Sequence, residues 1–142
     1  MSRSLDDLSP VIRPKVDQFL YACKAAGIDI IVNCTLRTLD EHAHAYAQGR
    51  TMPGPIVTNA KPGTSAHNYG LAVDVVPMVN GKPDWTFNAM HPSPAWEKIG
   101  RLGRLAGLEW FGDPSSLFVE GAHFQEPHWR EYLPGPRTRS TA

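Results

Sequence analysis

Apolar side chains in the first part of the chain recur with the spacing of one helical face, at Val16, Phe19, Leu20 and Cys23. This pattern predicts a helix from Pro10 to Ala26, with Ser9 as its N-cap. Gly27 follows at a position where helices commonly stop. Pro14 fits poorly inside a helix, which favours a start close to that residue.

Short runs of β-branched and other apolar residues predict strands elsewhere in the chain. The runs are Ile28–Cys34, Gly70–Pro77, Leu108–Phe111 and Ala122–Gln125. Asn80-Gly81 is typical of a tight turn, and Asp113–Ser116 predicts a second turn before the last strand.

Two further helices are predicted from their start signals. Thr38 followed by Glu41 forms a capping box, which predicts a helix over Leu39–Gln48, and a Ser-Pro pair opens another helix over Pro94–Gly107. Arg50–Ala66, rich in proline and glycine, is expected to be a long loop, and such loops are usually functional. Together the elements predict an α+β fold, a small and mainly antiparallel sheet flanked by helices.

The chain has 142 residues, with 14 basic and 14 acidic side chains. This length fits one domain, which we place at residues 1–130, followed by a flexible C-terminal tail at 131–142. Zero net charge disfavours a nucleic-acid partner, because such binders depend on a basic surface. Only Arg137 and Arg139 in the tail favour one.

No apolar run approaches the roughly 20 residues that span a bilayer, and the first residues lack the apolar core of a secretory signal. We therefore expect a monomer without stable membrane insertion, synthesised in the cytoplasm without a signal peptide. Cys23 and Cys34 lie in apolar surroundings with no CxxC pattern, so we expect both to be buried free thiols.

Asp74 stands out because apolar residues surround it inside a predicted strand. A buried carboxylate is costly unless it is paired or binds a metal. Backbone donors or an arginine could satisfy it, but His67 lies seven residues earlier, and Gly70 between them allows a sharp turn. A zinc site needs imidazole and carboxylate ligands, yet two ligands alone are weak evidence because this spacing also arises by chance.

His123 supplies a third candidate ligand, on a strand with Glu120 three residues before it. Glu120 could act as a general base on a metal-bound water, or it could be a solvated loop acid. Arg37 follows a strand and precedes the capped helix, where it could stabilise an oxyanion or hold a substrate carboxylate. The alternative for Arg37 is a surface ion pair with Asp40 or Glu41.

The remaining histidines carry weaker signals. His42 and His44 stand two residues apart in a helix, therefore on different faces, and we expect both at the surface. His91 is expected in a loop, and His128 could lie behind the ligands or at the rim of the site rather than act as a ligand. The sequence contains no HExxH, GxSxG or GxxxxGK[ST] motif, which disfavours a standard zincin helix, a serine hydrolase elbow and a phosphate loop.

Three sequence blocks together resemble the zinc D-alanyl-D-alanine carboxypeptidase and L-alanyl-D-glutamate peptidase family. The first block matches the SxHxxGxAxD motif at Ser65, His67, Gly70, Ala72 and Asp74. The segment 120–125 is similar to the second family motif, an acid three residues before a histidine and an aromatic residue. The segment 36–50 is similar to the arginine-bearing helix start. The resemblance runs from about Leu8 to Gln125.

By this resemblance, a zinc ion would lie in a cleft over the sheet, bound by His67, Asp74 and His123. Glu120 would be the general base. Arg37 would orient the substrate and stabilise the oxyanion, and Ser65 would line the site and contact the substrate. Two departures from the family pattern stand out in this sequence. His42 replaces a common glutamine, and Gly121-Ala122 replaces a common proline, which implies a less rigid loop.

The resemblance implies a zinc metallopeptidase that cuts peptidoglycan stem peptides, foremost at the L-alanyl-D-glutamate bond. Small members of this kind are phage or prophage endolysins, which reach the wall after holin-type release. A D-alanyl-D-alanine carboxypeptidase or dipeptidase is the close alternative. A zinc-stabilised binding module without catalysis is less favoured, because it would need neither Glu120 nor Arg37.

Overall fold

One antiparallel sheet organises the chain, and the computed structural model describes residues 1–116 and 118–133. Its strand order is β1-β2-β5-β4, with every pairing antiparallel. The strands are β1 Ile30–Cys34, β2 Ala72–Val79, β4 Glu109–Trp110 and β5 His123–Gln125. A short strand β3, Lys82–Pro83, pairs with β2 across the predicted Asn80-Gly81 turn.

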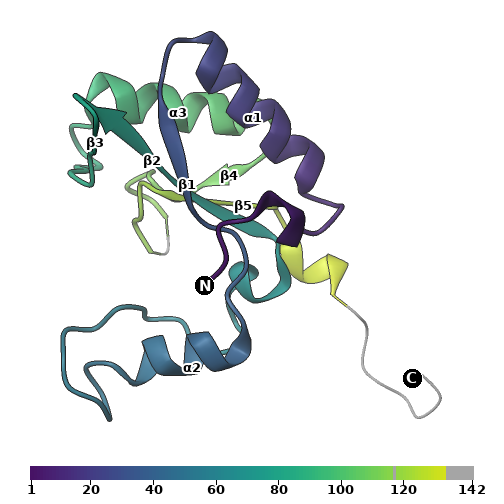
Figure 1. Cartoon of the computed structure of the whole chain (residues 1–142), viewed down its shortest axis with the longest axis vertical. Helices are drawn as coiled ribbons and strands as arrows, with labels where there is room; N and C mark the ends of the chain where they lie inside the picture. The colour runs from purple at the N-terminus through teal and green to yellow at the C-terminus, as the bar shows by residue number, and fades with distance from the viewer. Residues whose placement is uncertain (117, 134–142) are drawn as a thin grey trace.

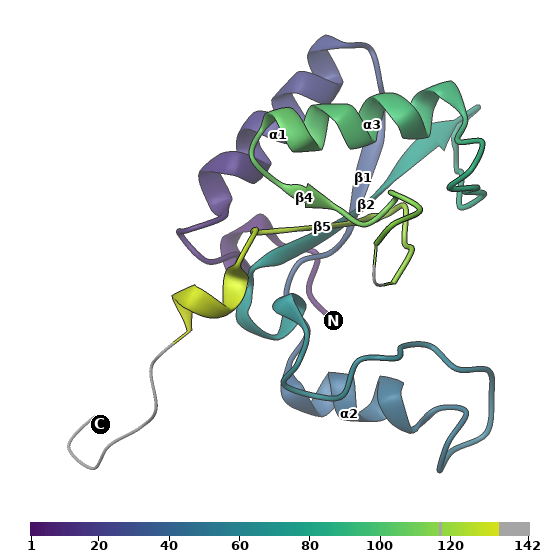
Figure 2. The same cartoon turned by 180° about the vertical axis from the view of Figure 1, so that it is seen from behind.

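Two helices, α1 (Arg13–Ala25) and α3 (Pro94–Leu105), cover one face of the sheet (Figure 1). The helix α2 (Leu39–Ala47) and the long loop after it project away on the opposite side, as the reverse view also shows (Figure 2). Short 3₁₀ helices complete the fold: η1 Leu5–Asp7, η2 Ala66–Tyr69 and η3 Trp129–Tyr132. The predicted α+β class is therefore confirmed.

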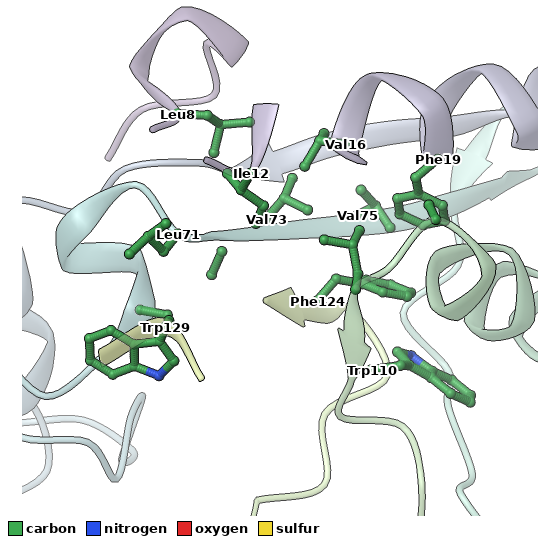
Figure 3. Packing of buried hydrophobic residues seen from close by; sticks show 14 of the residues in the cluster. Leu8, Ile12, Val16, Phe19, Leu71, Val73, Val75, Trp110, Phe124 and Trp129 are labelled. Atoms are coloured by element: carbon green, nitrogen blue, oxygen red, sulfur yellow. The ribbon is translucent and has the colours of Figure 1, made fainter. Parts of the chain in front are cut away.

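The hydrophobic core lies between the sheet and the two covering helices (Figure 3). Val73 and Val75 lie on the same face of β2, the face toward α1. Phe124 from β5 packs against Phe19, with ring centroids 4.6 Å apart. Because side chains alternate along a strand, residues between these positions point to the other face. Cys23, which lies in this core, and Cys34 are both buried free thiols, as expected.

The predicted element boundaries are close to those observed, with one difference of note. The first helix begins at Arg13 rather than Pro10, with Ile12 at the N-cap and no side-chain cap. Ser9 instead accepts from the backbone amide of Val11 in a preceding turn, at 3.2 Å. The tail expected at 131–142 lies outside the described residues from 134 onward. Among the described residues, no helix has the length and apolar character needed to cross a membrane.

The capping box at the start of α2 forms as the sequence predicts. Thr38 Oγ1 accepts from the Glu41 amide at 3.1 Å, and Glu41 Oε1 accepts from the Thr38 amide at 2.9 Å. The expectation that His42 lies at the surface is wrong, because its side chain is fully buried beneath the loop that follows α2. His44 is exposed, as predicted.

The helix α3 approaches the sheet closely through two glycines. A Cβ atom on Gly103 would lie 2.3 Å from the Phe124 ring, and one on Gly100 would lie 2.4 Å from the Trp110 ring. Both rings belong to the core, so neither can move without disturbing its neighbours.

We expect Gly103→Ala to lower the free energy of unfolding by about 1–3 kcal/mol, because overpacking outweighs the gain in helix propensity. Chemical denaturation would measure this change. Lys98→Ala, on the exposed side of α3, is the control and should stay within about 0.5 kcal/mol of the original chain. A Gly103→Ala chain as stable as the original would contradict the packing argument.

Candidate active site

The candidate site is built on the face of the sheet that α1 and α3 leave uncovered. Asp74 lies between Val73 and Val75 on β2, so its side chain points away from the core. The strand register places Asp74 opposite His123 on β5 and opposite Cys34 on β1. Strand pairing alone therefore brings one predicted carboxylate and one predicted imidazole together.

His67 reaches the same point from η2. Ser65 caps this short helix and accepts from the His67 amide at 3.3 Å, and Gly70 ends it in the left-handed conformation with φ of 69°. A side chain on Gly70 would also collide with the backbone at Asp7, since its Cβ would lie 2.8 Å from that carbonyl oxygen. The chain can therefore turn from η2 into β2 within two residues, which sets His67 Nε2 at 3.0 Å from Asp74 Oδ1.

Each imidazole is oriented through the nitrogen that faces away from Asp74. His67 Nδ1 lies 3.2 Å from the Thr35 carbonyl oxygen, which only accepts, so this nitrogen carries the proton. His123 Nε2 lies 2.9 Å from Gln125 Oε1, while the Gln125 amide nitrogen donates to Glu109 Oε1 at 3.3 Å. Glu109 thus fixes the orientation of the Gln125 amide, and His123 Nε2 is also a donor.

In the neutral rings, two nitrogen lone pairs therefore converge on one carboxylate oxygen, Asp74 Oδ1. The distances are 3.0 Å from His67 Nε2 and 3.2 Å from His123 Nδ1. An unprotonated imidazole nitrogen this close to a carboxylate oxygen is repelled by it unless a proton or a cation lies between them. Imidazole nitrogen and carboxylate oxygen are zinc ligands, and donation from the far nitrogen is the usual support for a metal-binding histidine. The donor set therefore fits zinc.

A proton takes the place of such a cation when none is bound. Burial would lower the pKa of His67, but the adjacent Asp74 carboxylate outweighs burial and raises this pKa to about 10. Burial would likewise raise the pKa of Asp74, yet His67 and His123 hold it well below its usual range. Both shifts favour an ion pair between an ionised Asp74 carboxylate and a protonated His67, and a metal would have to displace that proton.

A different set, Cys34, His67 and Asp74, is the one whose ligand atoms all lie close together among the described residues. One ligand atom each from Cys34, His67 and Asp74 lies within 4.8 Å of the others. However, Cys34 Sγ lies 3.6 Å from His67 Nδ1, the nitrogen already directed at the Thr35 carbonyl. Cys34 is also fully buried, which leaves substrate no access to that side of the ring. We therefore favour the set that includes His123.

All six site residues expected from the sequence line one cleft of about 270 Å³: Arg37, Ser65, His67, Asp74, Glu120 and His123. Glu120 is exposed and anchored by its amide, which donates to the Phe111 carbonyl at 2.8 Å. The Arg37 amide donates to the His67 carbonyl at 3.1 Å. Within the described part of the chain, the ion pair considered for Arg37 with Asp40 or Glu41 does not form.

The loop before His123 is more firmly anchored than its glycine implied. Trp110 Nε1 donates to the Gly121 carbonyl at 2.7 Å in a buried position. A Cβ atom on Gly121 would lie 2.6 Å from the Phe87 ring, so a larger residue would push the loop outward. Gly121 therefore lets the segment that carries Glu120 and His123 lie against the side chains of Phe87 and Trp110.

Several residues that line the cleft were not predicted from the sequence. They are Val57, Thr58, Ala60, Thr64, Phe111, Phe118, Gln125, Trp129 and Arg130. Gln125 could have been found, because it shares a strand face with His123 two residues away. The others come from loops or short 3₁₀ turns, where no periodic pattern predicts the direction of a side chain. His91 is exposed, as is His128, which does not line the cleft.

The chain is similar in sequence to a known family and to a characterised endopeptidase. Residues 6–110 match the family model described as D-alanyl-D-alanine carboxypeptidase, VanY. The match includes Arg37, His67 and Asp74 but ends before Glu120 and His123. The peptidoglycan L-alanyl-D-glutamate endopeptidase CwlK of Bacillus subtilis is 33% identical over 111 residues, which cover 75% of this chain and 66% of CwlK.

Solved structures with the same fold are more distant in sequence. The L-Ala D-Glu endopeptidase ChiX of Serratia marcescens is 24% identical with a TM-score of 0.60, over 92% of this chain and 90% of ChiX. A variant of the vancomycin resistance D,D-pentapeptidase VanY, solved in complex with Zn(II), is 20% identical with a TM-score of 0.57. That alignment covers 84% of this chain and 72% of the VanY chain. Because the family model matches most of the chain, the chain belongs to the D-alanyl-D-alanine carboxypeptidase (VanY) family.

Proposed function

We propose that this chain is a zinc-dependent peptidase that hydrolyses the L-alanyl-D-glutamate bond in peptidoglycan stem peptides. The observation that carries the proposal is that His67 Nε2 and His123 Nδ1 lie 3.0 Å and 3.2 Å from the same oxygen of Asp74 within a single cleft. The 33% sequence identity to CwlK, an L-alanyl-D-glutamate endopeptidase, supports cleavage of this bond rather than another.

The chemistry divides among a few side chains. A zinc ion held by His67, Asp74 and His123 would polarise the scissile carbonyl and lower the pKa of the attacking water. The Glu120 carboxylate accepts the proton of that water and later donates it to the leaving amine. The Arg37 guanidinium stabilises the developing oxyanion or holds a neighbouring carboxylate of the substrate.

The shape and charge of the cleft suit a short, anionic peptide. Val57, Phe118 and Trp129 offer apolar contacts, and the two cleft arginines, Arg37 and Arg130, form no ion pair among the described residues. Stem peptides carry free carboxylates beside their peptide bonds, and a guanidinium recognises a carboxylate through two parallel hydrogen bonds.

We expect Glu120→Gln to lower kcat by about 10²–10⁴-fold, because the amide cannot accept a proton from the attacking water. Zinc content, measured by elemental analysis, should stay unchanged. Glu97→Gln, an exposed residue on α3, serves as the control with full activity. Wall-lytic activity that survives Glu120→Gln would refute the general-base role.

Removal of a proposed ligand should remove the metal. His67→Ala and His123→Ala are expected to reduce the zinc content of the purified protein to near zero, whereas His91→Ala, an exposed loop histidine, should retain it. Elemental analysis of chains dialysed against the same zinc buffer measures this. Equal zinc in all three variants would contradict the ligand assignment.

Zinc uptake should also release protons. The metal-free cluster keeps a proton on His67, whose pKa is raised to about 10, and zinc can bind only after that proton leaves. Apparent affinity should therefore fall about tenfold for each pH unit below this pKa. Titration calorimetry in two buffers of different ionisation enthalpy would count the protons released. A pH-independent affinity would contradict a protonated metal-free site.

The close alternative is a D-alanyl-D-alanine carboxypeptidase or dipeptidase, which the family description favours. Mass spectrometry of digested stem peptides separates the two. The endopeptidase should yield fragments that begin with D-glutamate and no free D-alanine. Release of D-alanine alone would overturn the L-alanyl-D-glutamate assignment while leaving the metal site intact. A phage endolysin role with holin-type release stays a prediction, which lysis of wall preparations by the purified chain would support.

A further inference from the structure

A buried polar cluster outside the metal site connects one wall of the cleft to Arg37. The wall is the segment 58–65, which contributes Thr58, Ala60, Thr64 and Ser65 to the cleft. None of its side chains is buried, so apolar packing does not fix its position. Polar contacts hold this segment in place, and two side chains beneath it, His42 and Asn68, supply three of those contacts.

His42 contributes from the buried side of α2, with no exposed surface. Its Nε2 lies 2.8 Å from the Ala60 carbonyl oxygen, which only accepts, so Nε2 carries the proton. Its Nδ1 is therefore an acceptor in the neutral ring, and it lies 3.0 Å from the Asn68 amide nitrogen. One ring thus holds the wall at Ala60 and is itself oriented by Asn68.

Asn68 completes the cluster with every polar atom in use. Its Oδ1 accepts from the amides of Gly63 at 3.0 Å and Ser65 at 3.2 Å. Its Nδ2 donates to the Arg37 carbonyl at 3.0 Å as well as to His42. The wall is therefore tied at three backbone points to the residue that carries the cleft guanidinium. Side-chain bonds from Arg50 to the Thr58 carbonyl at 3.1 Å and from Tyr69 to the Gly63 carbonyl at 2.9 Å add to these ties.

We propose that His42 and Asn68 are positioning residues, which set the wall 58–65 relative to Arg37 and so determine how closely the cleft fits its substrate. Neither residue lines the cleft. They act through the residues that do, because even a small displacement of a substrate contact weakens binding or turnover. The kinetic part of this inference rests on the proposed peptidase function, whereas the structural part does not.

Two substitutions at His42 separate positioning from simple packing. A glutamine presents a donor and an acceptor about as far apart as the two ring nitrogens, so His42→Gln can keep both bonds. His42→Leu fills the space and keeps neither. His44→Ala, two residues along the same helix and exposed, is the matched control.

The first readout is amide hydrogen exchange of the free protein, which needs no substrate. In His42→Leu we expect exchange across 58–65 to accelerate about tenfold, since loss of a buried hydrogen bond removes that order of protection. Exchange in β2 and the zinc content should not change. His42→Gln and His44→Ala should keep the original protection. This result decides the positioning role even if no peptide is cleaved.

The second readout is the split between KM and kcat on a stem peptide. His42→Leu should raise KM about tenfold with a smaller effect on kcat, and His42→Gln should restore KM to within about twofold. If His42→Leu and His42→Gln behave alike in both readouts, whether both normal or both impaired, the proposal is overturned. Should His42→Leu not fold, His42→Asn replaces it, because its shorter side chain cannot reach both partners, and the same comparison decides.

Discussion

The structure around the site depends on how the negative charge of one carboxylate, Asp74, is compensated. Asp74 lies on a central strand whose neighbours, Val73 and Val75, build the core against α1. Alternation along the strand turns the carboxylate to the opposite face, where burial would leave it uncompensated. Two imidazoles meet that need, one brought by strand pairing and one by the turn at Gly70. The same strand therefore stabilises the fold on one face and forms the site on the other.

In His67 and His123, the position of the ring proton is set by the hydrogen-bond partner of the nitrogen that faces away from Asp74. The Thr35 carbonyl holds the proton on the far nitrogen of His67, and the Glu109–Gln125 pair does the same for His123. This arrangement leaves acceptors alone at the centre, which is unfavourable without a cation. The raised pKa of His67 follows, because the Asp74 carboxylate beside the ring stabilises a proton there more than burial disfavours it. The proposed affinity for a metal thus depends on the surrounding hydrogen bonds as much as on the proposed ligands.

Sequence patterns predicted the parts of this protein that depend on local chemistry. The capping box at Thr38 is one example, and the strand around Asp74 is another. The burial of His42 could not be predicted from such local patterns. Helical spacing correctly separates His42 from His44, but it cannot say which face becomes covered, because the cover is a loop without periodicity. For the same reason Arg130 and Trp129 were missed, since short 3₁₀ turns carry no pattern that directs a side chain.

The two halves of the site are held by different forces, and this division has a functional consequence. The proposed ligands lie on or beside the sheet, whose apolar core fixes their geometry. The wall 58–65 lies outside that core and depends on the polar cluster of His42 and Asn68. In the proposed peptidase, changes in the wall would therefore alter which peptide fits without disturbing the proposed ligands. A peptidase built this way would keep the proposed metal site while its loops adapt to different bonds of the proposed substrate.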